Sequence, residues 1–178
     1  MAAPAPAPVD PNGFRALISR WATGVAVVTA RDGTSDAGLT VNALTSISLH
    51  PPSVLVSLMR DVDTLPLIER SRRFAVSLLA ADQRALSERF ASPVPSAEKF
   101  RNLPLHRGPD DLPLPDGALG ALACRVTSLT PTFDHVLVVG EVVWQEVGRE
   151  APPLLFYRSG YGEPDPEGRV RLAPSRRP

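Results

Sequence analysis

The stretch from Leu39 to Leu58 places the strongest constraint on the fold of this 178-residue chain. It reads LTVNALTSISLHPPSVLVSL, in which hydroxyl and amide side chains interleave with valine, leucine and isoleucine before the pattern stops at two prolines. β-branched residues favour strands, whereas a proline cannot donate a hydrogen bond to a neighbouring strand. We therefore predict two strands here, with a bend at Pro51-Pro52 and His50 in the turn.

Helix and strand patterns flank this stretch. Asp10 and Pro11 supply an N-cap and a first helical residue, and apolar residues follow at helical spacing as far as Trp21. A β-branched run predicts a first strand at Val25–Thr29. The next segments predict, in order, a short helix from Thr64, a strand at 74–79, and a helix at 82–90 that is capped by Asp82.

A proline-rich segment opens the second half of the chain. Ser92–Asp116 contains six prolines, so we predict a long loop without regular structure, of the kind that often forms a lid or an active-site wall. Two longer strands are predicted at 119–129 and 136–147, and they can pair as a hairpin through 130–134. A short apolar segment at 154–157 ends the regular pattern.

These patterns predict a mainly β fold, an antiparallel β-barrel with short flanking helices. Five or six strands occur without the regular βαβ alternation of a doubly wound sheet. One domain accounts for the length, and we place it at residues 10–162. The Ala-Pro alternation before it predicts a disordered arm over residues 1–9, and the Pro, Gly and Arg content after it predicts a mobile tail over 163–178.

Charge and cysteine content exclude several classes of function. Lys plus Arg and Asp plus Glu both number 19, so no basic excess exists to drive nucleic-acid binding, and a small neutral or locally anionic ligand is expected instead. Cys124 is the only cysteine, and no Cys/His spacing resembles a metal site. The N-terminus has neither a basic start nor a long apolar segment, so we expect a cytoplasmic protein that does not enter a membrane.

Motifs of the common hydrolases and phosphate-binding enzymes are missing from the sequence. There is no Gly-rich phosphate loop after a strand, no G-x-S-x-G turn and no H-E-x-x-H helix. The density of Ser, Thr and Asn in the 39–58 stretch suits a different task, because hydroxyls and backbone N–H groups at a strand edge can bind a phosphate or the edge of a planar heterocycle. The alternative is that these groups cap turns and face water.

An ordered set of short motifs resembles the flavin reductase family, the reductase components of two-component flavin monooxygenases. The motifs extend over most of the domain, from about Phe14 to Gly162. They are GVAVVT from Gly24, GLTVNA from Gly38, SISLHPP from Ser46, RFAVSLL from Arg73, the Lys99-Phe100 pair, Cys124, Asp134-His135 before GEV at Gly140, and PLLFY from Pro153.

The resemblance implies a split β-barrel of Greek-key-like connection that forms a homodimer. It implies binding of FMN or FAD, reduction by NADH or NADPH, and delivery of reduced flavin to a partner monooxygenase. Hydride transfer to a flavin needs preorganised donors and no general base, so no catalytic side chain is assigned. The implied binding residues are Thr40, Val41, Asn42 and Ala43 along the flavin, Ser46 and Ile47 near its ring, Ser57, Arg60 and Thr64 toward its phosphate, Lys99 at a cofactor phosphate or in solvent, and Tyr157 near the flavin.

His135 is the residue that the resemblance assigns to the nicotinamide, whose carboxamide it would hydrogen-bond. Phe133 stands where the family has a glycine, which bears on the shape of this pocket because glycine permits a positive φ and close ligand approach. The alternative for His135 is a loop histidine bonded to its neighbours. Two further functions stay open at this point: a flavin carrier with little turnover, and a split-barrel oxidase that acts on another substrate.

Overall fold

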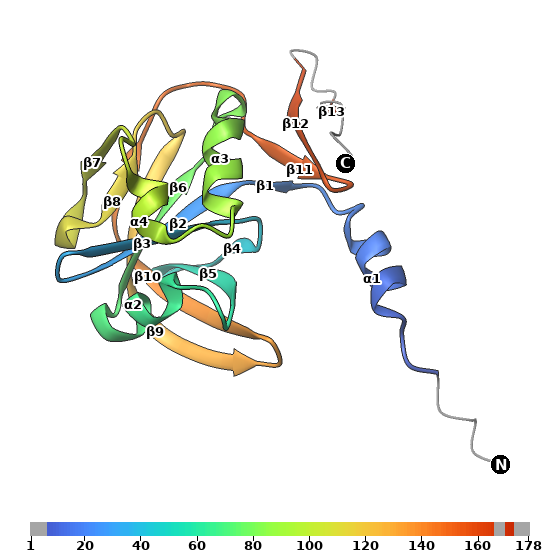
Figure 1. The fold of residues 1–178 in the computed structure, drawn as a ribbon, viewed down its shortest axis with the longest axis horizontal. Coiled ribbons are helices and arrows are strands. Elements are labelled where there is room, and N and C mark those ends of the chain that lie inside the picture. Colours follow the sequence, from blue (N-terminus) through green and yellow to red (C-terminus); the bar gives the residue numbers. More distant parts are fainter. Residues whose placement is uncertain (1–6, 166–169, 173–178) are drawn as a thin grey trace.

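A seven-stranded antiparallel sheet forms the centre of the molecule (Figure 1). The structure is a computed structural model, and it describes residues 7–165 and 170–172. The strand order is β3-β2-β6-β9-β10-β5-β4. The bounds are Ala26–Asp32 for β2, Ser35–Val41 for β3, Leu44–Leu49 for β4, Pro52–Met59 for β5, Arg73–Leu78 for β6, Gly120–Thr132 for β9 and His135–Val147 for β10.

Smaller elements surround this sheet. A second sheet has the order β1-β11-β12-β13, and β7 and β8 form a separate ribbon. In Figure 1, α1 projects away from the main sheet. The bounds are Thr23–Gly24 for β1, Leu105–Arg107 for β7, Pro113–Pro115 for β8, Leu155–Tyr157 for β11, Gly160–Pro164 for β12, Val170–Leu172 for β13, Pro11–Ile18 for α1, Thr64–Ser71 for α2, Arg84–Ala91 for α3 and Ser96–Phe100 for α4.

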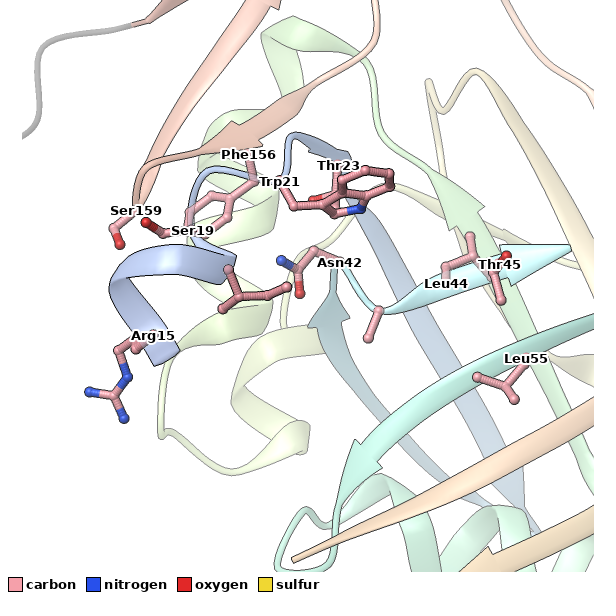
Figure 2. Close-up of a pocket in the computed structure, with 12 residues that line it drawn as sticks. Arg15, Ser19, Trp21, Thr23, Asn42, Leu44, Thr45, Leu55, Phe156 and Ser159 are labelled. Carbon is pink, nitrogen blue, oxygen red and sulfur yellow. The ribbon is translucent and has the colours of Figure 1, made fainter. Parts of the chain in front are cut away.

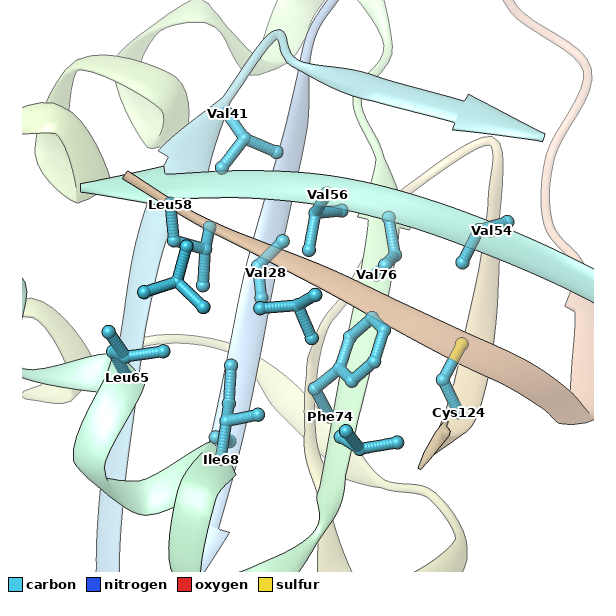
Figure 3. Packing of buried hydrophobic residues seen from close by; sticks show 14 of the residues in the cluster. Val28, Val41, Val54, Val56, Leu58, Leu65, Ile68, Phe74, Val76 and Cys124 are labelled. Atoms are coloured by element: carbon cyan, nitrogen blue, oxygen red, sulfur yellow. The ribbon is translucent and has the colours of Figure 1, made fainter. Parts of the chain in front are cut away.

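The main sheet curls around one apolar core (Figure 3). Its two edge strands, β3 and β4, are joined by only Asn42 and Ala43. Since consecutive Cα atoms are 3.8 Å apart, Val41 and Leu44 lie within about 11 Å of each other. The two edges of the sheet must therefore meet, which gives the mainly β, split-barrel architecture that the sequence predicts.

Side chains from both ends of the sheet share this core. Val41 of β3 and Val56 of β5 belong to the same buried cluster, together with Phe74 of β6 and Val138 of β10. Ile68 of α2 closes the cluster and is fully buried. Burying side chains of this size contributes about 1.5–3 kcal/mol each. No helix in residues 7–165 or 170–172 has the length and apolar character needed to cross a membrane.

The 39–58 stretch forms parts of three strands, so the prediction of two was wrong. The bend at Pro51-Pro52 is confirmed, but a second interruption falls at Asn42 and Ala43, where β3 ends and β4 begins. β3 also starts earlier than expected, at Ser35, after the turn at Gly33. Hydroxyl and apolar residues alternate on both sides of the interruption, so periodicity alone does not reveal it.

The predicted cap of the helix at 82–90 was also wrong. Residues Ala81–Gln83 form a 3₁₀ turn, and α3 begins only at Arg84. The Asp82 carboxylate pairs with the guanidinium of Arg149 instead of capping the helix. That hydrogen bond lowers the pKa of Asp82 below its usual value. The Asp82 carboxylate therefore forms a long-range ion pair, although the local sequence predicts that it caps the helix.

The proline-rich segment 92–116 contains regular structure, contrary to prediction. It holds α4, a 3₁₀ turn at Pro109–Asp111, and the paired strands β7 and β8. Leu112 and Leu114 are buried against alanines of β6 and β9, so apolar burial fixes this ribbon despite its prolines. The hydroxyl of Thr29 also donates to the carbonyl of Pro113 at 2.7 Å.

The terminal predictions are only partly covered by the described residues. Within the predicted tail, β12 extends to Pro164 and pairs with β13 at Val170–Leu172, so these parts are strands. Residues 166–169 and 173–178 lie outside the described residues. In the predicted arm, residues 7–9 are exposed and belong to no helix or strand, and residues 1–6 lie outside the described residues.

The β9–β10 hairpin is confirmed and is the longest strand pair. Thr132 pairs with His135, so Phe133 and Asp134 alone form the tip. Phe133 has a φ of 54°, in the left-handed region that glycine adopts more readily. The non-glycine residue therefore keeps the backbone conformation that a glycine would favour.

Gly140 offers a test of packing in the barrel. A Cβ at this position of β10 would lie 2.5 Å from the Phe74 ring and 2.9 Å from the Cys124 Cβ, whereas a Cβ at Gly24 would meet nothing within 4 Å. We expect Gly140→Ala to lower the free energy of unfolding by about 1–3 kcal/mol through overpacking. Gly24→Ala is the matched control and should change it much less. Urea unfolding measures both, and equal midpoints for the two variants would contradict this packing.

Candidate functional site

Three cavities meet at Asn42, at the interruption between β3 and β4. Their volumes are about 710, 310 and 160 Å³. Figure 2 shows the largest, with the Asn42 amide in its wall. The two larger cavities also share Trp21, Thr23 and Leu44, so they are neighbouring parts of one hollow.

The β3–β4 interruption is held beside β5. The backbone N–H of Ser57 donates to the carbonyl of Ala43 at 3.1 Å, and Leu44 then pairs with Val56. This turn leaves Asn42 and Ala43 exposed at the cavity. A short connection between two sheet edges therefore presents an amide side chain that no helix or strand covers.

Aromatic side chains form another wall of the hollow. Phe156 of β11 pairs through its backbone with Thr23, and its ring meets the Tyr161 ring edge to face at 5.4 Å. The Tyr161 hydroxyl lies 2.9 Å from Oγ of Ser87, and the Arg84 guanidinium covers the Tyr161 ring. These contacts hold Phe156 in a fixed position, so the wall is preformed.

Four predicted flavin residues line the cavities. Asn42 and Ala43 line the largest, and Thr40, Val41 and Asn42 line the smallest. The Thr40 hydroxyl donates to the carbonyl of Ser87 at 2.7 Å and so ties β3 to α3. The Val41 side chain belongs to the barrel core. The structure thus brings the GLTVNA motif to the hollow as a group.

Ser46, Ile47 and Ser57 lie close by, outside the walls of these three cavities. Ser46 and Ile47 are exposed on the edge strand β4. Ser57 is the backbone partner of Ala43 and is partly buried. Ser46 and Ile47 follow the 43–45 segment of the wall by one and two residues, and Ser57 lies one strand spacing of about 4.8 Å from it. A ligand that extends from the hollow would therefore reach all three.

Arg60 directly follows β5, and His135 is the first residue of β10. The Arg60 N–H donates to the carbonyl of Asp134 at 3.1 Å, and Nδ1 of His135 lies 2.8 Å from the Asp134 carboxylate. This bond lowers the pKa of Asp134. The alternative prediction for His135, a histidine bonded to its neighbour, therefore holds for Nδ1, whereas Nε2 takes no part in this contact.

His135 shares a sheet face with the largest cavity. It pairs with Met59, which lies four residues after the cavity residue Leu55 on β5. An even spacing keeps side chains on one face, and four residues span about 13 Å. A ligand lying along this face of β5 could contact both Leu55 and His135.

Lys99, Thr64 and Tyr157 do not line the three cavities. The Lys99 side chain is 6% exposed, and its ammonium donates to the carbonyls of Gly38 and Phe90. Thr64 is fully buried at the start of α2, with its hydroxyl unpaired among the described residues. Tyr157 follows Phe156 on β11, so the alternation of a strand turns it to the other face. Their predicted cofactor contacts stay predictions and would lie outside these three cavities.

Arg15, Trp21 and Thr23 are wall residues that the sequence did not single out for binding. Arg15 is the one charged side chain in the lining of the largest cavity. It shares a helix face with Ile18 and Ser19 by i, i+3 and i+4 spacing. That spacing is visible in sequence, but which face of α1 borders the cavity is not.

The chemistry of this hollow suits a planar ligand with an anionic part. Its lining combines one arginine, an amide, several hydroxyls and aromatic side chains. Cys124 is buried away in the core, where desolvation raises its pKa to about 12. Among the described residues, no three His, Cys, Asp or Glu side chains gather as a metal site would require.

Comparisons with known proteins identify the family that this chain resembles. The family model described as "Flavin reductase like domain" matches residues 18–165. The 4-hydroxyphenylacetate 3-monooxygenase reductase component of Thermus thermophilus is 38% identical, over 84% of this chain and 94% of the relative. An NADH-dependent flavin reductase of Rhodococcus sp is 37% identical, over 86% of each chain. The solved styrene monooxygenase flavin reductase of Pseudomonas putida is 32% identical, with a TM-score of 0.74 over 91% of this chain and 97% of that one.

Lys99 is the only lysine in the sequence, which makes its burial directly measurable. Because its ammonium is enclosed and bonded to two carbonyls, we expect an amine-reactive ester to modify Lys99 far more slowly in the native protein than in urea. Peptide mass spectrometry after timed labelling follows this side chain. Equal rates in the native and unfolded protein would show that the amine is open to solvent.

Proposed function

The chain belongs to the flavin reductase-like domain family, and we propose that it reduces FMN or FAD with NADH or NADPH and supplies the reduced flavin to a separate monooxygenase. One observation carries the proposal to this site: the GLTVNA residues Thr40 to Ala43 line the cavities that meet at Asn42. The largest cavity has about 710 Å³, within the usual range of about 300–1,000 Å³ for small-molecule sites.

The wall residues match the parts of a flavin. A bound flavin supplies the two-electron acceptor, and the protein must place it and stabilise the charge that it gains. Asn42 and Thr45 line the cavity, so the Asn42 amide can hydrogen-bond the polar edge of the ring, and the Thr45 hydroxyl, which donates to the Ser46 carbonyl, can accept a bond from it. We assign Arg15 to the anionic side chain of the flavin, since it is the cation in this wall. No proton donor with a shifted pKa is needed.

His135 is the proposed nicotinamide contact. With Nδ1–H donated to the Asp134 carboxylate, Nε2 becomes the acceptor and can bond the N–H of a carboxamide. Its place on the Leu55 face, about 13 Å along β5, lets a nucleotide extend from the hollow to the hairpin. His135 would thereby orient the hydride donor without taking part in proton transfer.

Phe133 does not favour the alternative of a flavin carrier. That alternative needs the phenylalanine to close the nucleotide pocket, but the Phe133 side chain is 91% exposed at the hairpin tip. The backbone keeps the positive φ that suits a glycine. An open tip leaves room for the nucleotide, so reductase turnover is the function that the geometry supports best.

A homodimer is part of the proposal. Phe14 and Leu17 of α1 are largely exposed, although their helix is amphipathic and extends from the barrel (Figure 1). Large apolar side chains gathered on one exposed face commonly mark an association surface. A second copy of the chain would cover this face, next to the largest cavity.

Nucleotide oxidation tests the proposed reaction. Purified protein with FMN or FAD should oxidise NADH or NADPH, seen as loss of nucleotide absorbance, and the ratio of kcat/KM values should rank the two flavins and the two nucleotides. Flavin-free protein should not oxidise the nucleotide when no flavin is added to the assay. Oxidation of neither nucleotide, with either flavin, would refute the proposal.

Replacing His135 tests the nicotinamide assignment. Losing one hydrogen bond worth about 1.4 kcal/mol should raise the KM for the nucleotide about tenfold in His135→Ala. The KM for flavin should change much less, because His135 lies outside the flavin cavities. His50→Ala is the matched control, since His50 is exposed in the turn before Pro51. An unchanged nucleotide KM in His135→Ala would remove this residue from the site.

A further inference from the structure

Trp21 is a large aromatic side chain left in solvent beside the hollow. It is 73% exposed, and it lines both the 710 Å³ and the 310 Å³ cavities (Figure 2). The second tryptophan, Trp144, packs instead against the buried cluster of Leu112 and Leu114. Exposing an indole forfeits the apolar burial that a side chain of this size can contribute.

The backbone around Trp21 is nevertheless fixed. The Trp21 N–H donates to the carbonyl three residues earlier at 2.9 Å, and the Ser19 carbonyl accepts from the N–H of Arg158 at 2.7 Å. Thr23 pairs with Phe156 in the second sheet. The indole therefore stands at a defined place in the wall, held from both sides, while its ring remains available to a ligand.

Thr23 supplies an independent observation in the same wall. Its Oγ1 is buried and has no hydrogen-bond partner among the described residues, although Thr23 lines both of the larger cavities. Buried hydroxyls are nearly always paired, so an unpaired one at a cavity indicates a missing partner. The carbonyl or ring nitrogen of a heterocycle in this hollow could provide that partner.

We propose that Trp21 is the ring-stacking residue of the flavin site, with the Thr23 hydroxyl bonding the edge of the stacked ring. The proposal rests on the proposed function. Its basis is the exposed indole, the unpaired hydroxyl and the neighbouring Asn42 amide in one wall. Stacking of a base on an aromatic side chain is a strong contact that tolerates different heterocycles, because each has a π-face.

Stacking on Trp21 also distinguishes the two oxidation states of the ligand. The oxidised isoalloxazine ring is planar and electron-poor, so it matches the electron-rich face of an indole. The reduced ring is electron-rich and bent, so it stacks less well. Trp21 therefore holds the substrate form of the flavin more tightly than the product form, which favours release of reduced flavin to a partner.

The test measures binding of FMN and FAD rather than turnover. In Trp21→Leu, the Kd for oxidised FMN should rise about tenfold, in line with the usual loss of one stacking contact. Equilibrium dialysis gives the Kd, and the emission of bound flavin reports contact with the indole, which quenches it. Emission at saturation should therefore be higher in Trp21→Leu, and Trp21→Phe should restore part of the affinity. Anaerobic titration should show a smaller preference for oxidised over reduced flavin in Trp21→Leu.

Trp144→Phe is the matched control, because it removes an indole that packs against a buried cluster outside the three cavities. Its Kd and bound-flavin emission should equal those of the wild-type protein. Wild-type Kd and wild-type quenching in Trp21→Leu would overturn the assignment of Trp21. A Trp21→Leu protein that sediments as a smaller species yet quenches flavin fully would overturn it too, and would assign Trp21 to an interface between copies. Failure of the wild-type protein to bind either flavin would instead refute the proposed function.

Discussion

The hydrogen bond from the Ser57 amide to the Ala43 carbonyl starts the pairing of β4 with β5, just two residues after β3 has ended. β3 and β4 are the opposite edges of the seven-stranded sheet, so this short link forces the edges together and curls the sheet into a barrel. We call the place where these two edges meet the β3–β4 seam. The same link leaves Asn42 without a strand partner at this seam. The closure of the barrel and the position of the candidate site are therefore consequences of one connection.

Elements around the seam stabilise this arrangement. The Lys99 ammonium binds the Gly38 carbonyl of β3 and the Phe90 carbonyl of α3, and the Thr40 hydroxyl binds the Ser87 carbonyl of the same helix. A Cβ at Gly38 would lie 2.7 Å from the Phe90 ring, which shows how closely α3 approaches the strand. Lys99 and Thr40, which the family resemblance assigns to the cofactor, thus hold β3 against α3 behind the cavities. On the cavity side, the wall is formed by α1, β1 and β11, and β11 lies more than 100 residues from the other two in sequence.

The fold was largely predictable because its strands carry local β-branched patterns and its family motifs occur in order. The bend at Pro51, the hairpin before His135 and burial of Cys124 follow from residue types alone. The seam at Asn42 was not predictable in the same way, because its alternating pattern continues across the interruption. Among the residues that line the cavities, the sequence singled out the contiguous motif Thr40 to Ala43, whose role at a cofactor stays a prediction. The positions of Arg15 and Trp21 in the cavity wall depend on how α1 lies relative to β11. Helical spacing does not predict this long-range packing.

Hydrogen exchange measured with and without FMN tests the central claim most directly, namely that flavin binds in the hollow at the β3–β4 seam. Mass spectrometry should show that FMN slows exchange of the amides of residues 40–46 and 19–24, which surround the shared cavities. A separate cavity lies where β9 begins and β10 ends, and His106, Asp116 and Arg149 line it. It serves as an internal reference, and the exchange rates of the amides around it should not change. Protection of the segments around His106 and Arg149, with none at residues 40–46, would contradict the account.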